Sequence, residues 1–172
     1  MGGDRLRSIV VSAAMTALAL VLPGLFHMLG LGSKFLPLLL PLLVNGFLAG
    51  FPWAVLTGAV APLLSALATG MPPLYPPVAL VLSAEGAVLG GVASALWRGG
   101  RGRLWVALIA AVVAGRATTF LLTWLLAGAF GLPPAVAAGG TVLQGLPGVA
   151  LELAVTALAV PRLRKGILFS HE

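Results

Sequence analysis

The sequence predicts an all-α integral membrane protein, a single bundle of six transmembrane helices with both termini in the cytoplasm. Of its 172 residues, 60% are hydrophobic and only 8% are charged, whereas a soluble domain of this size has about a quarter of its residues charged. The mean hydropathy is +1.12. The basic residues stand at the ends of apolar runs. The net charge of +6 is therefore explained by membrane topology and not by nucleic-acid binding.

The apolar runs divide the chain into six expected crossings. One crossing needs about 20 residues, and residues 35–84 contain no charged residue. That stretch must therefore hold two crossings and a connection. The expected helices, within one domain covering residues 1–172, are residues 8–26, 35–50, 54–69, 78–97, 104–128 and 141–160. We expect residues 51–53 to form an inner turn and residues 131–140 to form an outer loop.

The orientation follows from the distribution of basic residues. With six crossings, Lys34 falls on one side of the membrane and all the other basic residues outside the membrane fall on the opposite side. These are Arg5, Arg7, Arg98, Arg101, Arg103, Arg162, Arg164 and Lys165. The positive-inside rule then places both termini in the cytoplasm. Trp53, Trp97 and Trp105 fall at the inner helix ends, as an aromatic belt would.

A proline-rich connection between the third and fourth expected helices is the most distinctive segment. Residues 70–77 read Gly-Met-Pro-Pro-Leu-Tyr-Pro-Pro, and proline cannot continue a helix because it lacks a donor and clashes with the preceding turn. We expect a stiff, extended segment of polyproline type, with Tyr75 near the membrane surface. It is uncharged, so we interpret it as a lid across the outer mouth of the bundle.

Small residues one helical turn apart mark surfaces where another helix can approach closely. Ala13 and Ala17 form such a pair on the first helix, although internal packing of an alanine-rich helix would give the same pattern. Further pairs are Gly46/Gly50, Ala54/Gly58 and Gly86/Gly90.

Chemistry must come from the polar residues at membrane depth, because an unpaired charge is costly there. The main candidates are Asn45, Glu85, Arg116 and Glu152, and weaker ones are Thr57, Ser65, Thr119, Thr123 and Gln144. Two carboxylates with one guanidinium carry a formal charge of −1. Either one Glu is protonated, or it reaches water, or something else pairs with it.

Arg116 is expected to point inward and to pair with at least one of the two acids. Such a pair either fixes the helix register or contacts substrate. We assign Glu85, nearer the outer mouth, to the ligand and Glu152 to a structural role. His27 is either an interfacial side chain or a ligand contact, and Asn45 makes either a helix–helix hydrogen bond or a ligand contact.

Catalysis is not expected from these residues. The only aspartate is Asp4, the only histidines are His27 and His171, and cysteine is absent, so aspartyl chemistry and multi-histidine or cysteine metal sites lack their residues. No phosphate-binding loop for ATP is present. We predict no metal and no cofactor. A stand-alone proton-coupled carrier using Glu85 or Glu152 remains an alternative, weakened because no repeat relates the two halves. A non-catalytic membrane scaffold is another.

An ordered set of short motifs along the chain indicates a resemblance to a known family. It comprises Ala13-x-x-x-Ala17, His27 with Gly30, Phe35-Leu36-Pro37, Pro41, Gly46, Pro62-Leu63-Leu64-Ser65, Gly70-Met71-Pro72-Pro73, Glu85, Gly115-Arg116, Gly145-Leu146-Pro147-Gly148 and Pro161. Over nearly its whole length the chain resembles the substrate-binding S components of energy-coupling factor (ECF) vitamin transporters. It departs from them at Leu38-Leu39-Leu40, where relatives often carry Met-His-Ile.

The resemblance implies a multi-pass protein of a prokaryotic plasma membrane that binds a vitamin or related micronutrient from outside. It would dock on a transmembrane T protein carrying two ATPase subunits and topple in the bilayer to release its cargo. The Ala13/Ala17 face would contact the T protein. The ligand would lie under the first, third and fifth loops, residues 27–34, 70–77 and 129–140. The candidate substrate-binding residues are His27, Asn45, Met71, Tyr75, Glu85, Arg116 and Gln144.

Overall fold

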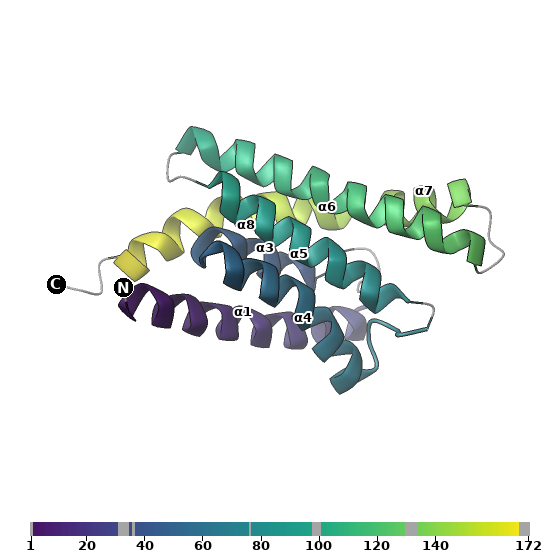
Figure 1. Cartoon of the computed structure of the whole chain (residues 1–172), viewed down its shortest axis with the longest axis horizontal. Helices are drawn as coiled ribbons and strands as arrows, with labels where there is room; N and C mark the ends of the chain where they lie inside the picture. The colour runs from purple at the N-terminus through teal and green to yellow at the C-terminus, as the bar shows by residue number, and fades with distance from the viewer. Residues whose placement is uncertain are drawn as a thin grey trace.

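The computed structural model describes residues 2–30, 35, 37–75, 77–97, 101–129 and 134–168, and in these residues it contains helices and short connections but no strand. The helices in chain order are α1 (Gly2–Met28), α3 (Leu39–Leu48), α4 (Phe51–Thr69), α5 (Val78–Leu96), α6 (Arg101–Ala129), α7 (Pro134–Gln144) and α8 (Leu146–Leu168) (Figure 1). The all-α prediction is confirmed.

Five of the described helices, α1, α4, α5, α6 and α8, are long and apolar enough to cross a membrane. The protein is therefore a multi-pass membrane protein. Helix α3 has 10 residues, about 15 Å at the rise of an α-helix, and is buried along almost its whole length. The count of six crossings stays a prediction.

The inner turn lies earlier in the chain than expected. Residues 51–53 are not a turn but the first turn of α4, and Gly50, in an extended conformation, precedes the helix. Pro52 fits there because the first helical residues need no backbone donor. The chain reverses at Ala49 and Gly50, so α3 ends at Leu48.

The expected outer loop at residues 131–140 is also wrong where the structure describes it. Helix α7 begins at Pro134, a residue whose fixed backbone angle favours the first position of a helix. The chain leaves helical geometry again at Gly145, so Gln144 ends α7 and does not lie inside a helix that starts at Thr141. Helix α8 continues through Pro161 to Leu168.

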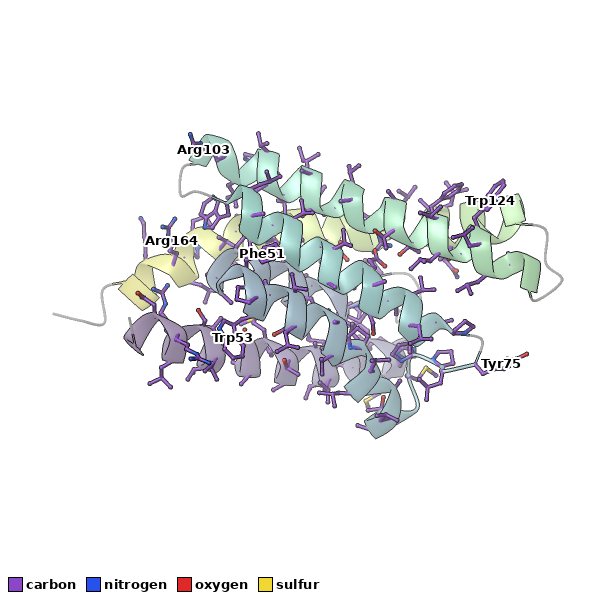
Figure 2. The ribbon with its side chains drawn as sticks, viewed as in Figure 1. Phe51, Trp53, Tyr75, Arg103, Trp124 and Arg164 are labelled. Atoms are coloured by element: carbon purple, nitrogen blue, oxygen red, sulfur yellow. The ribbon has the colours of Figure 1, made fainter. Side chains whose placement is uncertain are left out.

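The bundle has two distinct ends. The start of α1 and the end of α8 lie at one end, where α5 also ends and α6 begins, and the segment after α4 lies at the opposite end, where α6 also ends (Figure 1). Arg103 and Arg164 lie at the first end, which we call the basic end (Figure 2). Tyr75 and Trp124 lie at the opposite end, which we call the lid end.

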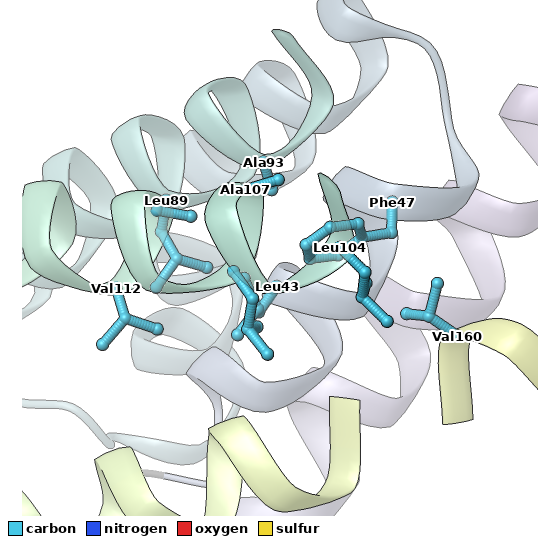
Figure 3. Close-up of a cluster of buried hydrophobic side chains, with 10 residues drawn as sticks. Leu43, Phe47, Leu89, Ala93, Leu104, Ala107, Val112 and Val160 are labelled. Carbon is cyan, nitrogen blue, oxygen red and sulfur yellow. The ribbon is translucent and has the colours of Figure 1, made fainter. Parts of the chain in front are cut away.

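Helix α3 occupies the centre and packs on α1, α4, α5 and α8. Its Leu43 and Phe47 join one hydrophobic cluster with residues of α5, α6 and α8, among them Leu89, Leu108 and Val160 (Figure 3). A second cluster contains Leu38, Leu39, Leu42, Ala19, Ala61 and Leu82. Two of the three leucines that depart from the family motif are therefore core residues.

Helices α4 and α5 touch through their backbones. A Cβ atom on Gly58 would lie 2.2 Å from the Gly86 carbonyl oxygen, and one on Gly86 would lie 2.6 Å from the Gly58 carbonyl oxygen. A Cβ on Gly90 would meet the Ala54 carbonyl oxygen at 2.9 Å. The predicted pairs Ala54/Gly58 and Gly86/Gly90 thus pack against each other, and we call this contact the glycine seam. Gly50 lies outside the glycine seam, because a Cβ atom on it would meet only Ser8 and Pro52.

Replacing Gly58 by alanine should destabilise the protein by about 1–3 kcal/mol, because the added methyl group overpacks a contact between backbones. Thermal unfolding of the purified protein in detergent measures the loss. Gly24→Ala in α1 is the matched control, since nothing lies within 4 Å of a Cβ at that position, and there alanine should stabilise the helix slightly. If Gly58→Ala and Gly24→Ala changed the stability of the protein equally, the close contact between α4 and α5 at Gly58 would be contradicted.

Candidate functional site

A cluster of buried polar side chains joins α5, α6 and α8. Its members are Glu85, Arg116, Thr119, Glu152 and Thr156, which are between 0% and 9% exposed. Gly115 lets α6 approach α5 here, because a Cβ at that position would be 3.3 Å from Leu89 Cδ1 and 3.5 Å from Glu85 Cγ. We call this set the buried polar cluster.

Glu85 has partners for both of its oxygen atoms. Its Oε1 forms an ion pair with Arg116, and its Oε2 accepts a hydrogen bond of 2.6 Å from the Thr119 hydroxyl. Arg116 and Thr119 are three residues apart and so share one face of α6. The expectation that Arg116 points inward and pairs with an acid is confirmed.

Glu152 is placed differently from what we expected. It is 1% exposed, and neither of its carboxylate oxygens has a hydrogen-bond partner among the described residues. It lies within range of electrostatic interaction with both Arg116 and Glu85. The partner of Arg116 is thus Glu85, the acid assigned to the ligand, and not Glu152, the acid assigned to architecture.

Thr156, which the sequence did not single out, belongs beside Glu152. It lies four residues later in α8 and is therefore on the same face. It is fully buried, and its hydroxyl also has no described partner. The spacing of four from a buried acid was the signal that could have found it.

Asn45 connects two helices. Its Oδ1 accepts a hydrogen bond of 3.2 Å from Ser12 of α1, whereas its Nδ2 has no described partner. The side chain is fully buried in α3. The helix–helix alternative is therefore observed, and a ligand contact stays a prediction.

Four other candidates lie outside the buried cluster. His27 is exposed at the end of α1, with Nδ1 2.8 Å from the Pro23 carbonyl oxygen. Met71 and Tyr75 are 48% and 80% exposed in the segment after α4. Gln144 is exposed at the end of α7. Within the described residues, no group of three or more His, Asp or Glu side chains is arranged to hold a metal ion.

The proline-rich segment is tied to both neighbouring helices. Gly70 ends α4 with a φ of 74°, a left-handed conformation that favours glycine. The Ser65 hydroxyl donates a hydrogen bond of 2.7 Å to the Met71 carbonyl, and Thr69 donates to the same carbonyl at 3.1 Å. On the other side, the Ala79 N–H donates to the Pro73 carbonyl at 3.1 Å. The role of Ser65 was not foreseen, although its position one turn before Thr69 and the following glycine could have indicated it.

Ala13 and Ala17 are exposed. Helix α1 packs on α3 and α4 through its other face, where Ser12 and Ala19 are buried. The alanine pair therefore does not contribute to the packing of the described bundle.

Comparison with known proteins adds one finding. A family model described as "ECF transporter, substrate-specific component" matches residues 7–160. No curated protein and no solved structure matches the chain. The matched stretch contains the alanine face, the proline-rich segment and the buried polar cluster.

Arg116→Gln should destabilise the empty protein by about 3–5 kcal/mol, because it leaves the Glu85 carboxylate buried without its partner. Thermal unfolding in detergent measures this loss, and Arg103→Gln at the exposed start of α6 serves as a control that should change stability by less than about 0.5 kcal/mol. Adding Glu85→Gln to Arg116→Gln should recover part of the loss. A double variant as unstable as the sum of the single variants would show that the two side chains do not act as a pair.

Proposed function

Because the chain belongs to the substrate-specific components of ECF transporters, we propose that it captures a vitamin or related micronutrient from outside the cell and delivers it through a transmembrane T protein and an ATPase module. Members of this family are substrate-binding subunits of transporters and not enzymes. The family match over residues 7–160 is the observation that carries this proposal.

We further propose that both termini face the cytoplasm of a prokaryote, with the basic end inside. Arginines of α6 and α8 gather at this end of the bundle (Figure 2), as the positive-inside rule requires of a cytoplasmic side. Arg164 lies over the Trp97 ring at 5.3 Å, and Trp97 packs edge-on against Phe47 at 5.5 Å. Aromatic side chains beside basic ones are typical of a membrane interface.

The substrate site is proposed to open at the lid end. Glu85 lies seven residues inside α5, about 10 Å from the start of that helix at the helical rise, and it brings Arg116 to the same depth. The exposed His27, Met71, Tyr75 and Gln144 would contact the substrate from the rim, and the proline-rich segment would cover it. Asn45 would contribute from α3.

A stand-alone proton-coupled carrier is the second candidate, and the buried carboxylates of Glu85 and Glu152 are the observation that favours it. Reconstitution separates the two functions. Native mass spectrometry of the purified protein first identifies a vitamin that co-purifies with it. Liposomes that contain the protein should then accumulate this vitamin only when the T protein and the ATPases are present. Uptake driven by a proton gradient without those subunits would identify a carrier.

Ala13→Trp or Ala17→Trp should abolish transport and leave ligand binding in detergent unchanged. A bulky side chain prevents the close approach of a partner helix, and both positions are exposed, so the fold has no need of them. Co-purification with the T protein and vitamin uptake are the measurements. Ala117→Trp, on the exposed face of α6, is the matched control and should keep both. Full uptake by the α1 variants would place the docking surface elsewhere.

Ser65→Ala should speed ligand dissociation roughly fivefold, the effect of losing a hydrogen bond worth about 1 kcal/mol, because the Met71 carbonyl of the proline-rich segment loses one of its two hydrogen bonds from α4. Stopped-flow dissociation from the purified protein measures the rate. Ser94→Ala removes an equivalent hydroxyl, one that donates to the Ala49 carbonyl at 3.3 Å near the basic end, and should leave the rate unchanged. Replacing Pro72, Pro73, Pro76 and Pro77 by glycine should also speed dissociation, since a stiff segment loses less entropy on closing. Unchanged dissociation would mean that the segment is only a connection.

A further inference from the structure

The buried polar cluster has an unbalanced charge. Within the described bundle, the ionisable side chains away from both ends are Glu85, Arg116 and Glu152, with exposed fractions of 0%, 9% and 1%. Two carboxylates and one guanidinium sum to −1 when all three are ionised. A buried charge without a counter-charge costs several kcal/mol in a protein interior, and the cost is high at membrane depth as well. The cluster therefore requires one further positive charge.

That missing charge belongs at Glu152 and not at Glu85. Glu85 is fully occupied, by Arg116 on one oxygen and by Thr119 on the other. Both oxygens of Glu152 lack a described partner, as does the hydroxyl of Thr156 one turn further along α8. Three oxygen acceptors thus lie on one buried face of α8.

Among the described residues, the helices that pack on α8 offer no second cation. Helix α8 packs on α3, α6 and α7. The sequences of α3 and α7 contain no ionisable side chain. Helix α6 supplies Arg116, which is ion-paired with Glu85 and also acts electrostatically on Glu152, but its single positive charge cannot balance two carboxylates. Among the described residues there is no second cation beside the cluster to balance the charge that Glu152 adds.

We propose that the substrate of this protein carries a positive charge, and that its cationic group binds Glu152 in exchange for a proton that the carboxyl holds in the empty protein. The inference rests on the proposed function as a substrate-binding subunit. A proton occupies no volume and so fits the empty cluster, which then has zero net charge. The cationic group of the substrate brings the same single charge, and the displaced proton leaves to water. The cluster is therefore neutral in both states.

An anionic substrate does not fit the same cluster. A carboxylate or phosphate would compete with Glu85 for Arg116 and would leave an additional uncompensated negative charge. The remaining described arginines and lysine are Arg5, Arg7, Arg101, Arg103, Arg162, Arg164 and Lys165, in the segments that begin or end at the basic end. Lys34 lies outside the described residues.

The charge of the substrate is tested with the full-length protein in lipid nanodiscs and a panel of water-soluble vitamins and their precursors, grouped as cationic, uncharged or anionic at neutral pH. We expect a cationic compound to raise the unfolding temperature, and Glu152→Gln to weaken its binding roughly 30-fold or more, as loss of one partner of a buried charge pair does. Asp4→Asn, the same acid-to-amide change at an exposed position, should bind as the wild type does.

The possible failures of this experiment are distinguishable. If an anionic or uncharged compound stabilises the wild type and Glu152→Gln equally, the protein binds a vitamin and the charge inference is overturned. If no compound of the panel stabilises the wild type, the proposed function is contradicted, and the inference that rests on it falls too.

The proton on Glu152 is tested without any ligand. Glutamine has the shape of a protonated glutamate but does not ionise in the unfolded chain, so Glu152→Gln should be at least as stable as the wild type, and the difference should grow as pH rises. If the folded protein holds a proton that the unfolded chain releases, stability falls as pH rises. Above the ordinary pKa of glutamate, about 4.3, the unfolding temperature of the wild type should therefore fall more steeply with pH than that of Glu152→Gln. Parallel profiles would overturn the proposal.

Discussion

A charge inside an apolar bundle has to find its opposite charge within the protein, and the pairing of Glu85 with Arg116 meets this requirement. The pair links α5 to α6 across a contact that is otherwise made by Leu89, Gly115 and similar apolar residues. Its position therefore fixes how far α6 can slide along α5, since any shift separates the two charges. Helix α7 packs mainly against α6, so its place at the lid end depends indirectly on the same pair.

Helix α3 has the complementary role. It is too short to be a typical membrane span, yet it packs on α1, α4, α5 and α8, and it takes part in both hydrophobic clusters. A short helix that is buried on nearly every side does not meet lipid along its length, so its length need not match the thickness of the bilayer. Asn45 adds a polar contact from this core to α1.

The sequence allowed the helical class, the long apolar helices and the inward direction of Arg116 to be predicted, because hydrophobic length and the cost of buried charge are local properties. We misplaced the inner turn because a proline can either end a helix or lie in its first turn, and the sequence alone does not tell which applies to Pro52. Helix α7 was missed for the same reason at Pro134. The choice between Glu85 and Glu152 could not be made from depth alone. It depends on the approach of Gly115 to α5, which only the packed structure shows.

The glycine seam has a consequence for how the mouth of the bundle can open. The proline-rich segment leaves α4 at Gly70 and enters α5 at Val78, and hydrogen bonds hold it to Ser65 on one side and to Ala79 on the other. Backbone contact at Gly58 and Gly86 holds α4 against α5, seven residues before Ser65 and seven residues after Ala79. For the substrate site proposed at the lid end, a widening of the entrance would therefore involve α1, α6 and α7 more than the α4–α5 pair, and the entrance would open asymmetrically.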